Sequence, residues 1–303
     1  MARFRNVITA LSGVVLATIA WAAPAAAQDK LKVVASFSIL ADLARNVGGN
    51  RIEVAALVGP GGDAHVYQPT PADARKLGDA KVIVVNGLKL EGWIGRLVKS
   101  SGTKAALVEA SRGVTALKAE EGHDHGHGAL DPHAWQDVRN AKIYVANIRE
   151  AFAKADPAGQ ETYEANAKAY AGQLDVLDAE IRAAVARIPA DRRKVITSHD
   201  AFRYFETAYG LDFIAPQGVS TEAEASAKAV GRIIQQIKRE KVPAVFVETI
   251  TDQRLIERIA KETGAKIGET VYSDALSGAE GPAGTYIDMM RHNIRAFSAA
   301  LSS

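Results

Sequence analysis

The chain has 303 residues, of which 37 are Lys or Arg and 35 are Asp or Glu, and it contains no cysteine. The balanced charge, with no block of basic residues, argues against nucleic acid or an anionic membrane as the binding partner. The lack of cysteine excludes disulfides, thiolate ligands and thiol nucleophiles, so a transition-metal site would need nitrogen and oxygen ligands.

The first 27 residues have the pattern of a secretory signal peptide. Arg3 and Arg5 supply a positive start, residues 7–21 are largely apolar, and residues 24–27 offer the small side chains that a signal peptidase needs. The apolar run is too short for a convincing membrane span. With cleavage near Ala27 and no cysteine to carry a lipid anchor, we expect a mature protein that is free in the periplasm.

The mature chain alternates strand-like and helix-like segments, which is the pattern of an α/β fold. Its first half predicts strands over residues 31–37, 52–58, 81–85 and 105–108. It also predicts helices over residues 39–47, 92–98 and 137–155, and one starting at Thr70-Pro71. Together these segments predict an N-terminal α/β lobe over residues 28–155.

A second long helix is predicted after Asp156-Pro157, because apolar residues then recur at intervals of three, four and seven as far as Ile188. About thirty helical residues span roughly 45 Å, which is longer than one small lobe. We therefore expect residues 156–188 to form a rigid helix that links two lobes.

The second half repeats the alternation without any sequence repeat. It predicts strands over residues 194–197, 211–214, 244–247 and 266–271 and helices over residues 221–240, 252–263 and 285–301. These segments predict a C-terminal α/β lobe over residues 189–303. The expected fold class is α/β, with two lobes built on central parallel sheets and joined by the one long helix.

Three histidines each stand in a short, restricted segment. His65 lies in D-A-H-V-Y-Q-P-T-P, His133 in D-P-H-A-W and His199 in T-S-H-D-A-F, while Asp274 in Y-S-D-A-L offers a carboxylate. His65, His199 and Asp274 follow strand ends, where ligands bind in parallel α/β sheets. Three imidazoles and one carboxylate can form a closed four-coordinate site, with zinc the first candidate. We expect this site in the cleft between the lobes.

Other carboxylates flank these residues. Glu248, at the end of its own predicted strand, is the rival to Asp274 as fourth ligand. The carboxylates next to the histidines could orient the imidazoles as hydrogen-bond acceptors, or could only cap helices and turns; they are Asp63, Asp131 and Asp200.

A histidine-rich run lies within residues 121–128, in a stretch that loses periodicity. It consists of His123, Asp124, His125, Gly126 and His127. Such a run is typical of an exposed metal-catching loop, and we expect weak auxiliary metal binding there. The alternative is a solvated linker with no role in metal binding.

Common enzyme motifs are missing. Ser198, His199 and Asp200 are adjacent and therefore cannot aim at one another as a catalytic triad must. Neither H-E-x-x-H, G-x-S-x-G nor a P-loop occurs. One alternative from a different class stays open, namely a zinc-dependent hydrolase in which Asp274 acts as base beside a zinc-bound water.

The whole mature chain resembles the metal-binding solute receptors of bacterial ABC uptake systems, the cluster A-I family. Residues 63–71 look like its D-P-H-x-Y-E-P-T-P motif, with Ala64 in place of the proline and Gln68 in place of the glutamate. The family's further motifs are matched by residues 86–93, 131–135, 198–202, 218–224 and 285–290.

This resemblance implies that His65, His133, His199 and Asp274 contact the metal. It also implies a monomeric receptor, not an enzyme, that delivers Zn²⁺ to a membrane ABC permease, with a periplasmic zinc chaperone as a further partner. Manganese members commonly carry a carboxylate where this chain has His199, so the resemblance favours zinc. A manganese receptor or an adhesin of the same fold is the alternative.

Overall fold

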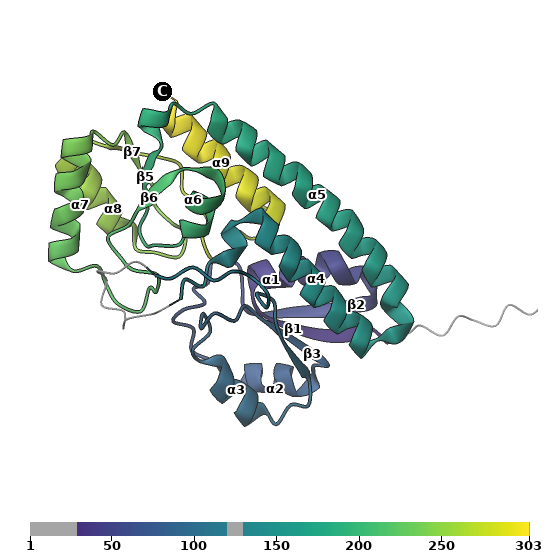
Figure 1. The fold of residues 1–303 in the computed structure, drawn as a ribbon. Coiled ribbons are helices and arrows are strands. Elements are labelled where there is room, and N and C mark those ends of the chain that lie inside the picture. The colour runs from purple at the N-terminus through teal and green to yellow at the C-terminus, as the bar shows by residue number, and fades with distance from the viewer. Residues whose placement is uncertain (1–28, 120–129, 303) are drawn as a thin grey trace, which may run out of the picture.

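The computed structural model describes residues 29–119 and 130–302. The predicted signal peptide, and the histidine-rich run with His123, Asp124, His125 and His127, therefore lie outside the described residues. Figure 1 shows the arrangement of the described elements: two α/β lobes, with one long helix running along both of them.

The N-terminal lobe is built on a four-stranded parallel sheet in the order β2-β1-β3-β4. Its strands are β1 (Leu31–Phe37), β2 (Ile52–Val58), β3 (Val82–Val85) and β4 (Ala106–Glu109). Its helices are α1 (Ser38–Gly48), α2 (Pro71–Asp79), α3 (Ile94–Ser101) and α4 (Val138–Ala155). α1 and α4 cover one face of the sheet, and α2 and α3 lie on the other (Figure 1).

The C-terminal lobe has a second parallel sheet, in the order β6-β5-β7-β8. Its strands are shorter: β5 (Lys194–Ile196), β6 (Asp212–Ile214), β7 (Ala244–Val245) and β8 (Lys266–Ile267). Its helices are α6 (Arg203–Tyr209), α7 (Ala227–Glu240), α8 (Gln253–Thr263) and α9 (Tyr286–Leu301). The fold class predicted from the sequence, two parallel-sheet α/β lobes, is confirmed.

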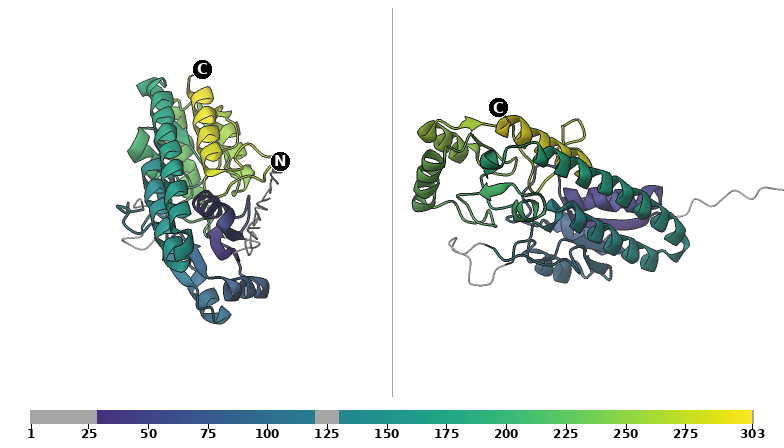
Figure 2. Two further views of the ribbon diagram at one scale, coloured as in Figure 1. Left: turned by 90° about the vertical axis from the view of Figure 1, so that its right-hand side faces the viewer. Right: turned by 45° about the horizontal axis from the view of Figure 1, so that its top comes forward.

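The predicted long helix is also confirmed, as α5 (Gln160–Ala186), which follows a short 3₁₀ turn over Pro157–Gly159. Its 27 residues span about 40 Å. Its buried side chains pack against α1 and α4 of the first lobe and against α9 of the second, and Figure 2 shows α5 and α9 side by side. The lobe boundaries at residues 155 and 188 stay a prediction.

The largest hydrophobic core runs through both lobes and includes buried side chains of β1, α5 and α9. A smaller core lies under α7 and α8. Because the larger core is shared, the two lobes cannot swing far apart without exposing apolar surface to water. Within the described ranges, no helix has the length and apolar character needed to cross a membrane.

The sequence predictions differ most from the structure at three places. The helix predicted from residue 221 begins only at Ala227, because Ser226 is its N-cap and accepts the Ala229 N–H. The strand predicted over 266–271 ends at Ile267, and pairing resumes only as a single bridge between Glu248 and Val271. The seven residues of α6 were not predicted, since two helical turns carry little periodic signal.

Candidate metal centre

His65 lies in the loop between β2 and α2. This loop ends at Thr70, which caps α2 by accepting the Asp73 N–H, with Pro71 at the first helical position. The indole N–H of Trp93 donates to the carbonyl of Ala64 at 2.8 Å, which fixes the backbone beside the histidine.

His133 lies just before a 3₁₀ turn, Ala134–Gln136, that leads into α4. The Asn86 side chain donates to the carbonyl of Pro132 at 2.9 Å and holds the backbone on one side of the histidine. One carboxylate oxygen of Asp131, Oδ1, accepts the His133 main-chain N–H at 2.9 Å and lies 2.7 Å from its ring Nδ1. The ring therefore presents Nε2 away from Asp131.

His199 follows β5, and the carboxylate of Glu248 lies against it. Glu248 Oε1 accepts the main-chain N–H groups of Ser198 and His199, at 2.7 and 2.8 Å. Glu248 Oε2 lies 2.6 Å from His199 Nδ1. This one buried carboxylate thus holds both the backbone and the ring of His199, and leaves Nε2 to point elsewhere.

Asp274 follows the bridge that joins Val271 to Glu248. The carbonyl of the preceding Ser273 accepts two hydrogen bonds, from Trp135 Nε1 at 2.9 Å and from Gln136 Nε2 at 2.8 Å. These two donors lie two and three residues after His133 in the chain. The Asp274 and His133 segments, 141 residues apart, are thereby tied to each other across the two lobes.

The four side chains converge on one point. One ligand atom from each of His65, His133, His199 and Asp274 lies within 4.8 Å of the others. His133 Nε2 is 3.3 Å from Asp274 Oδ1 and from His65 Nε2, and His199 Nε2 is 3.0 Å from Asp274 Oδ2. Ligands of a tetrahedral zinc ion are separated by roughly 3.4 Å. The spacing therefore matches a His₃Asp cluster around a single cation.

Burial and charge shape this cluster. Asp274, His133 and His199 are fully buried, and 4% of the His65 side chain is exposed. Burial would raise the pKa of Asp274, but the facing histidines hold it well below its usual range. Burial lowers the pKa of His65 to about 3. A carboxylate that stays ionised inside the protein requires a positive charge beside it, which a bound cation supplies.

The pKa values of the other two histidines, His133 and His199, are raised instead of lowered. Burial alone would lower the pKa of His199, but the carboxylates of Glu248 and Asp274 outweigh it and raise the pKa well above its ordinary value. For His133, burial is likewise outweighed, by Asp274 and Asp131, and the pKa is raised. Protons and metal ions therefore compete for these two rings.

Buried polar atoms without a hydrogen-bond partner indicate whether the cluster suits a metal ion. Within the described part of the chain, His199 Nε2 and Asp274 Oδ1 are among the buried polar atoms that make no hydrogen bond of acceptable geometry. Such atoms are costly in a protein interior unless a ligand satisfies them. Both belong to the four-residue cluster and face its centre, so the donor set is consistent with a divalent cation.

The flanking carboxylates take different positions. Asp131 lies against the ring of His133, as the sequence suggested. Asp63 does not use its carboxylate in this way: Oδ1 accepts the main-chain N–H of His65 at 2.8 Å, and Oδ2 accepts the hydroxyl of Thr221 at 2.6 Å. The main-chain N–H of Asp200 donates to the carbonyls of Gln217 and Gly218, and the carboxylate placed at the His199 ring is that of Glu248.

No role could be predicted from the sequence motifs for the side chains that hold the ligand segments in place. Asn86 and Trp93 belong to the stretch 86–93, and they hold the His133 and His65 segments from a distance in the chain. Glu248 was considered only as a rival ligand, whereas its carboxylate lies on the Nδ1 side of His199, away from the ligand atoms. The hint in the sequence was a glutamate at the end of a predicted strand.

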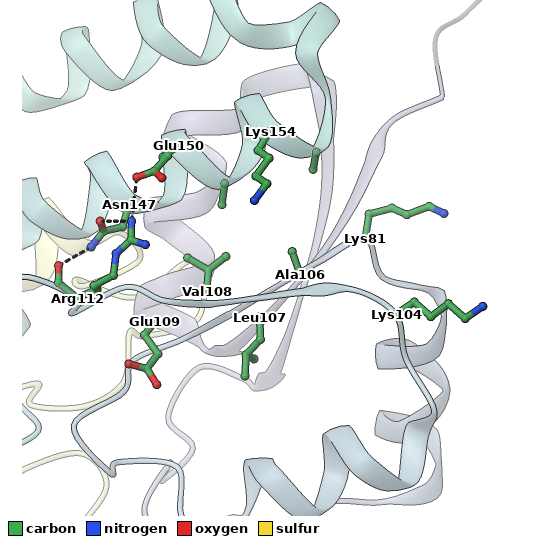
Figure 3. A pocket seen from close by; sticks show the side chains of 12 residues that line it. Lys81, Lys104, Ala106, Leu107, Val108, Glu109, Arg112, Asn147, Glu150 and Lys154 are labelled. Atoms are coloured by element: carbon green, nitrogen blue, oxygen red, sulfur yellow. Dashed lines mark hydrogen bonds and ion pairs between the residues drawn. The ribbon is translucent and has the colours of Figure 1, made fainter.

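Cavities also lie outside the cluster among the described residues. One, of about 650 Å³, runs between β4 and α4 and is lined at one end by Lys81, Lys104 and Lys154 (Figure 3). At its other end Arg112 contacts Asn147 and Glu150 (Figure 3). It contains no histidine and is not the metal centre. A second cavity, of about 480 Å³, is lined partly by Asp63 and Thr221 and lies beside the His65 loop.

Comparison with known proteins shows which family the sequence of this chain matches. The family described as zinc-uptake complex component A, periplasmic (ZnuA) matches residues 33–300. The chain is 40% identical over 275 residues to the manganese-binding lipoprotein MntA of Halalkalibacterium halodurans, covering 90% of this chain and 89% of that one. It is 38% identical over 272 residues to the iron-binding protein YfeA of Yersinia pestis, covering 89% and 86%.

A solved structure supports the same assignment. The periplasmic zinc-binding protein TroA of Treponema pallidum superposes with a TM-score of 0.84 at 33% identity, covering 90% of this chain and 99% of TroA. The named ligands of these relatives are thus manganese, iron and zinc.

Proposed function

This chain belongs to the family of zinc-uptake complex component A, and we propose that it captures Zn²⁺ and delivers it to an ABC permease. Members of the family are metal-binding receptors of ABC transporters and not enzymes, so the hydrolase alternative is set aside. The observation that carries the proposal is the convergence of His65, His133, His199 and Asp274 within 4.8 Å.

The choice of zinc rests on the donor atoms. Three imidazole nitrogens and one carboxylate oxygen suit zinc, whereas manganese prefers sites richer in oxygen. His199 decides this balance, because a carboxylate at that position would make two nitrogens and two oxygens. The match to TroA, a protein named for zinc, supports the same choice.

Manganese is the second candidate, and a specific observation favours it: the relative that is 40% identical is named as manganese-binding. The intrinsic order of affinities places zinc above manganese at almost any nitrogen and oxygen site, so cellular availability can decide which ion is carried.

Competition titration tests the metal. Protein freed of metal is titrated with Zn²⁺ and Mn²⁺ against a chromogenic chelator, and native mass spectrometry counts the ions bound. We expect one tight Zn²⁺ per chain and weaker Mn²⁺ binding. Tighter binding of Mn²⁺ than of Zn²⁺ would overturn the zinc proposal and leave the receptor function standing.

The remaining features of the proposal concern the cellular localisation and the partners of the protein. The family description is periplasmic, and the relatives are consistent with an exported protein. We propose a monomer that also receives metal from a zinc chaperone. The run His123, Asp124, His125, Gly126 and His127 is proposed as a weak auxiliary site, so a deletion of residues 121–128 should leave the tight site nearly intact.

A further inference from the structure

The three histidines of the cluster are supported unequally. Asp131 lies 2.7 Å from Nδ1 of His133, and Glu248 lies 2.6 Å from Nδ1 of His199. Among the described residues, the only carboxylate within 4.0 Å of the His65 ring is that of Asp274, at Nε2. A carboxylate at the far ring nitrogen fixes the orientation of an imidazole ligand, so His65 is the ligand with the least support.

His65 is also the candidate ligand nearest to solvent. Its side chain keeps 4% exposure, whereas those of His133, His199 and Asp274 keep none. The neighbouring Val66 is 45% exposed, which is unusual for a large apolar side chain in this molecule. Less protein therefore separates the centre from solvent at His65 than at any other candidate ligand.

A side-chain hydrogen bond between the lobes lies on this side, in addition to the main-chain bond from Gly61 N–H to the carbonyl of Leu276. Asp63 Oδ1 accepts the His65 main-chain N–H at 2.8 Å, and Asp63 Oδ2 accepts the Thr221 hydroxyl at 2.6 Å. Thr221 belongs to the segment that precedes α7, so the bond joins residues 158 apart in the chain. The cavity of about 480 Å³ borders this bond and is lined by Asp63, Thr221, Gln217 and Arg254, among others.

We propose that His65 is the exchangeable ligand, the one that releases first when the metal leaves, and that Thr221 is a positioning residue that holds His65 in place through Asp63. This inference rests on the proposed function. When the hydrogen bond between the Thr221 hydroxyl and Asp63 breaks, the His65 loop can move into the adjoining cavity. His133, His199 and Asp274 stay in place because their buried partners hold them.

The test measures the rate of metal dissociation. Thr221→Val removes the hydroxyl at nearly constant volume, and Thr221→Ser keeps it as the matched control. Because a hydrogen bond to a charged group is lost, Thr221→Val should speed Zn²⁺ dissociation into excess chelator about tenfold, and Thr221→Ser should behave like the unaltered protein. The association rate and the melting temperature of the metal-free protein should change little.

A double variant tests whether Thr221 acts through Asp63. Asp63→Ala should also speed dissociation, and adding Thr221→Val to it should cause no further increase, because the partner is already gone. Equal dissociation rates for Thr221→Val and the unaltered protein would overturn the inference, as would additive effects in the double variant.

The failure of the inference can be separated from that of the proposed function. If the unaltered protein binds Mn²⁺ more tightly than Zn²⁺, the same variants are measured with Mn²⁺ and the inference is judged on those rates. If the unaltered protein binds neither ion, both the inference and the proposed function are overturned.

Discussion

The two lobes have sheets of the same parallel topology, yet they hold their halves of the metal centre by different means. The sheet of the first lobe has strands of four to seven residues, and there the Asp131 carboxylate beside His133 is supplemented by neutral hydrogen bonds from Asn86 and Trp93, which brace the two histidine segments. The sheet of the second lobe has strands of only two or three residues, and there the buried carboxylate of Glu248 holds His199 directly.

This difference shows how a short sheet can still build a rigid site. With few ladder bonds in β5 and β7, the backbone after these strands gains order from Glu248, which accepts two main-chain N–H groups and pairs with Val271 on the way to Asp274. Charge-assisted hydrogen bonds are stronger than neutral ones. The His199 segment should therefore be more sensitive to the loss of Glu248 than the first-lobe segments are to the loss of one contact.

The largest effect is expected from removing a candidate ligand of the second lobe. His199→Ala should weaken Zn²⁺ binding by more than the roughly 10- to 100-fold that follows the loss of a supporting group. His199→Glu, as a comparison, should keep four ligands and shift the preference toward Mn²⁺, because it replaces nitrogen by oxygen. Chelator competition measures both, and wild-type affinity in His199→Ala would contradict the assignment.

The effect of pH is expected to be nearly as large. Carboxylates raise the pKa of His133 and His199 despite their burial, so zinc must displace protons from these rings, whereas burial keeps His65, with its pKa of about 3, neutral above pH 5. Affinity should fall with falling pH by up to about a hundredfold per unit, since about two protons are displaced. Calorimetry in buffers of different ionisation enthalpy counts these protons, and a count near three would contradict a neutral His65.

The contribution of His133 and His199 to the stability of the metal-free protein should change with pH in the opposite direction to zinc affinity. A histidine whose pKa is raised by folding stabilises the fold below its ordinary pKa of about 6.5, and this contribution is lost as the pH rises through the raised value. The rise in melting temperature caused by zinc should therefore shrink on acidification. An unchanged zinc effect at pH 5 and pH 7.5 would argue against histidine ligands.

Glu248→Gln tests the buried carboxylate itself. The amide keeps the size of the side chain but removes the charge beside His199 Nδ1, so Zn²⁺ affinity should fall by about 10- to 100-fold. Glu262→Gln, which changes an exposed glutamate of α8, is the matched control and should have no effect. Equal affinities of the two variants would show that the second lobe does not depend on Glu248.

The smallest effect is expected on the first-lobe side. Thr70→Ala removes the cap of α2, at the end of the His65 loop, and should lower the free energy of unfolding by about 1 kcal/mol. Zinc affinity should hardly change, because the Trp93 and Asp63 contacts remain. Denaturant unfolding and chelator competition measure the two quantities. A loss of affinity as large as that of Glu248→Gln would remove the contrast between the lobes.

Local elements were predicted well where a strong local signal existed. Thr70 and Pro71 form a cap and first turn, and the helix start follows from these two residues alone. α7 was predicted to start too early, because Thr221 and Ser226 are both acceptable caps, and in the structure Ser226 caps the helix while the Thr221 hydroxyl donates to Asp63. The strand to residue 271 was overpredicted, since apolar alternation does not say whether a partner strand continues.

The sequence by itself determined the α/β alternation, the long helix, and a short set of histidines and carboxylates suited to a transition metal. Only the tertiary structure decided which carboxylate meets which ring nitrogen. Asp274 faces the Nε2 atoms, Glu248 takes the Nδ1 side of His199, and Asp63 turns to Thr221 of the other lobe. The physical reason is that spacing along the chain constrains only near neighbours, whereas these contacts depend on how strands and loops far apart in the chain pack together.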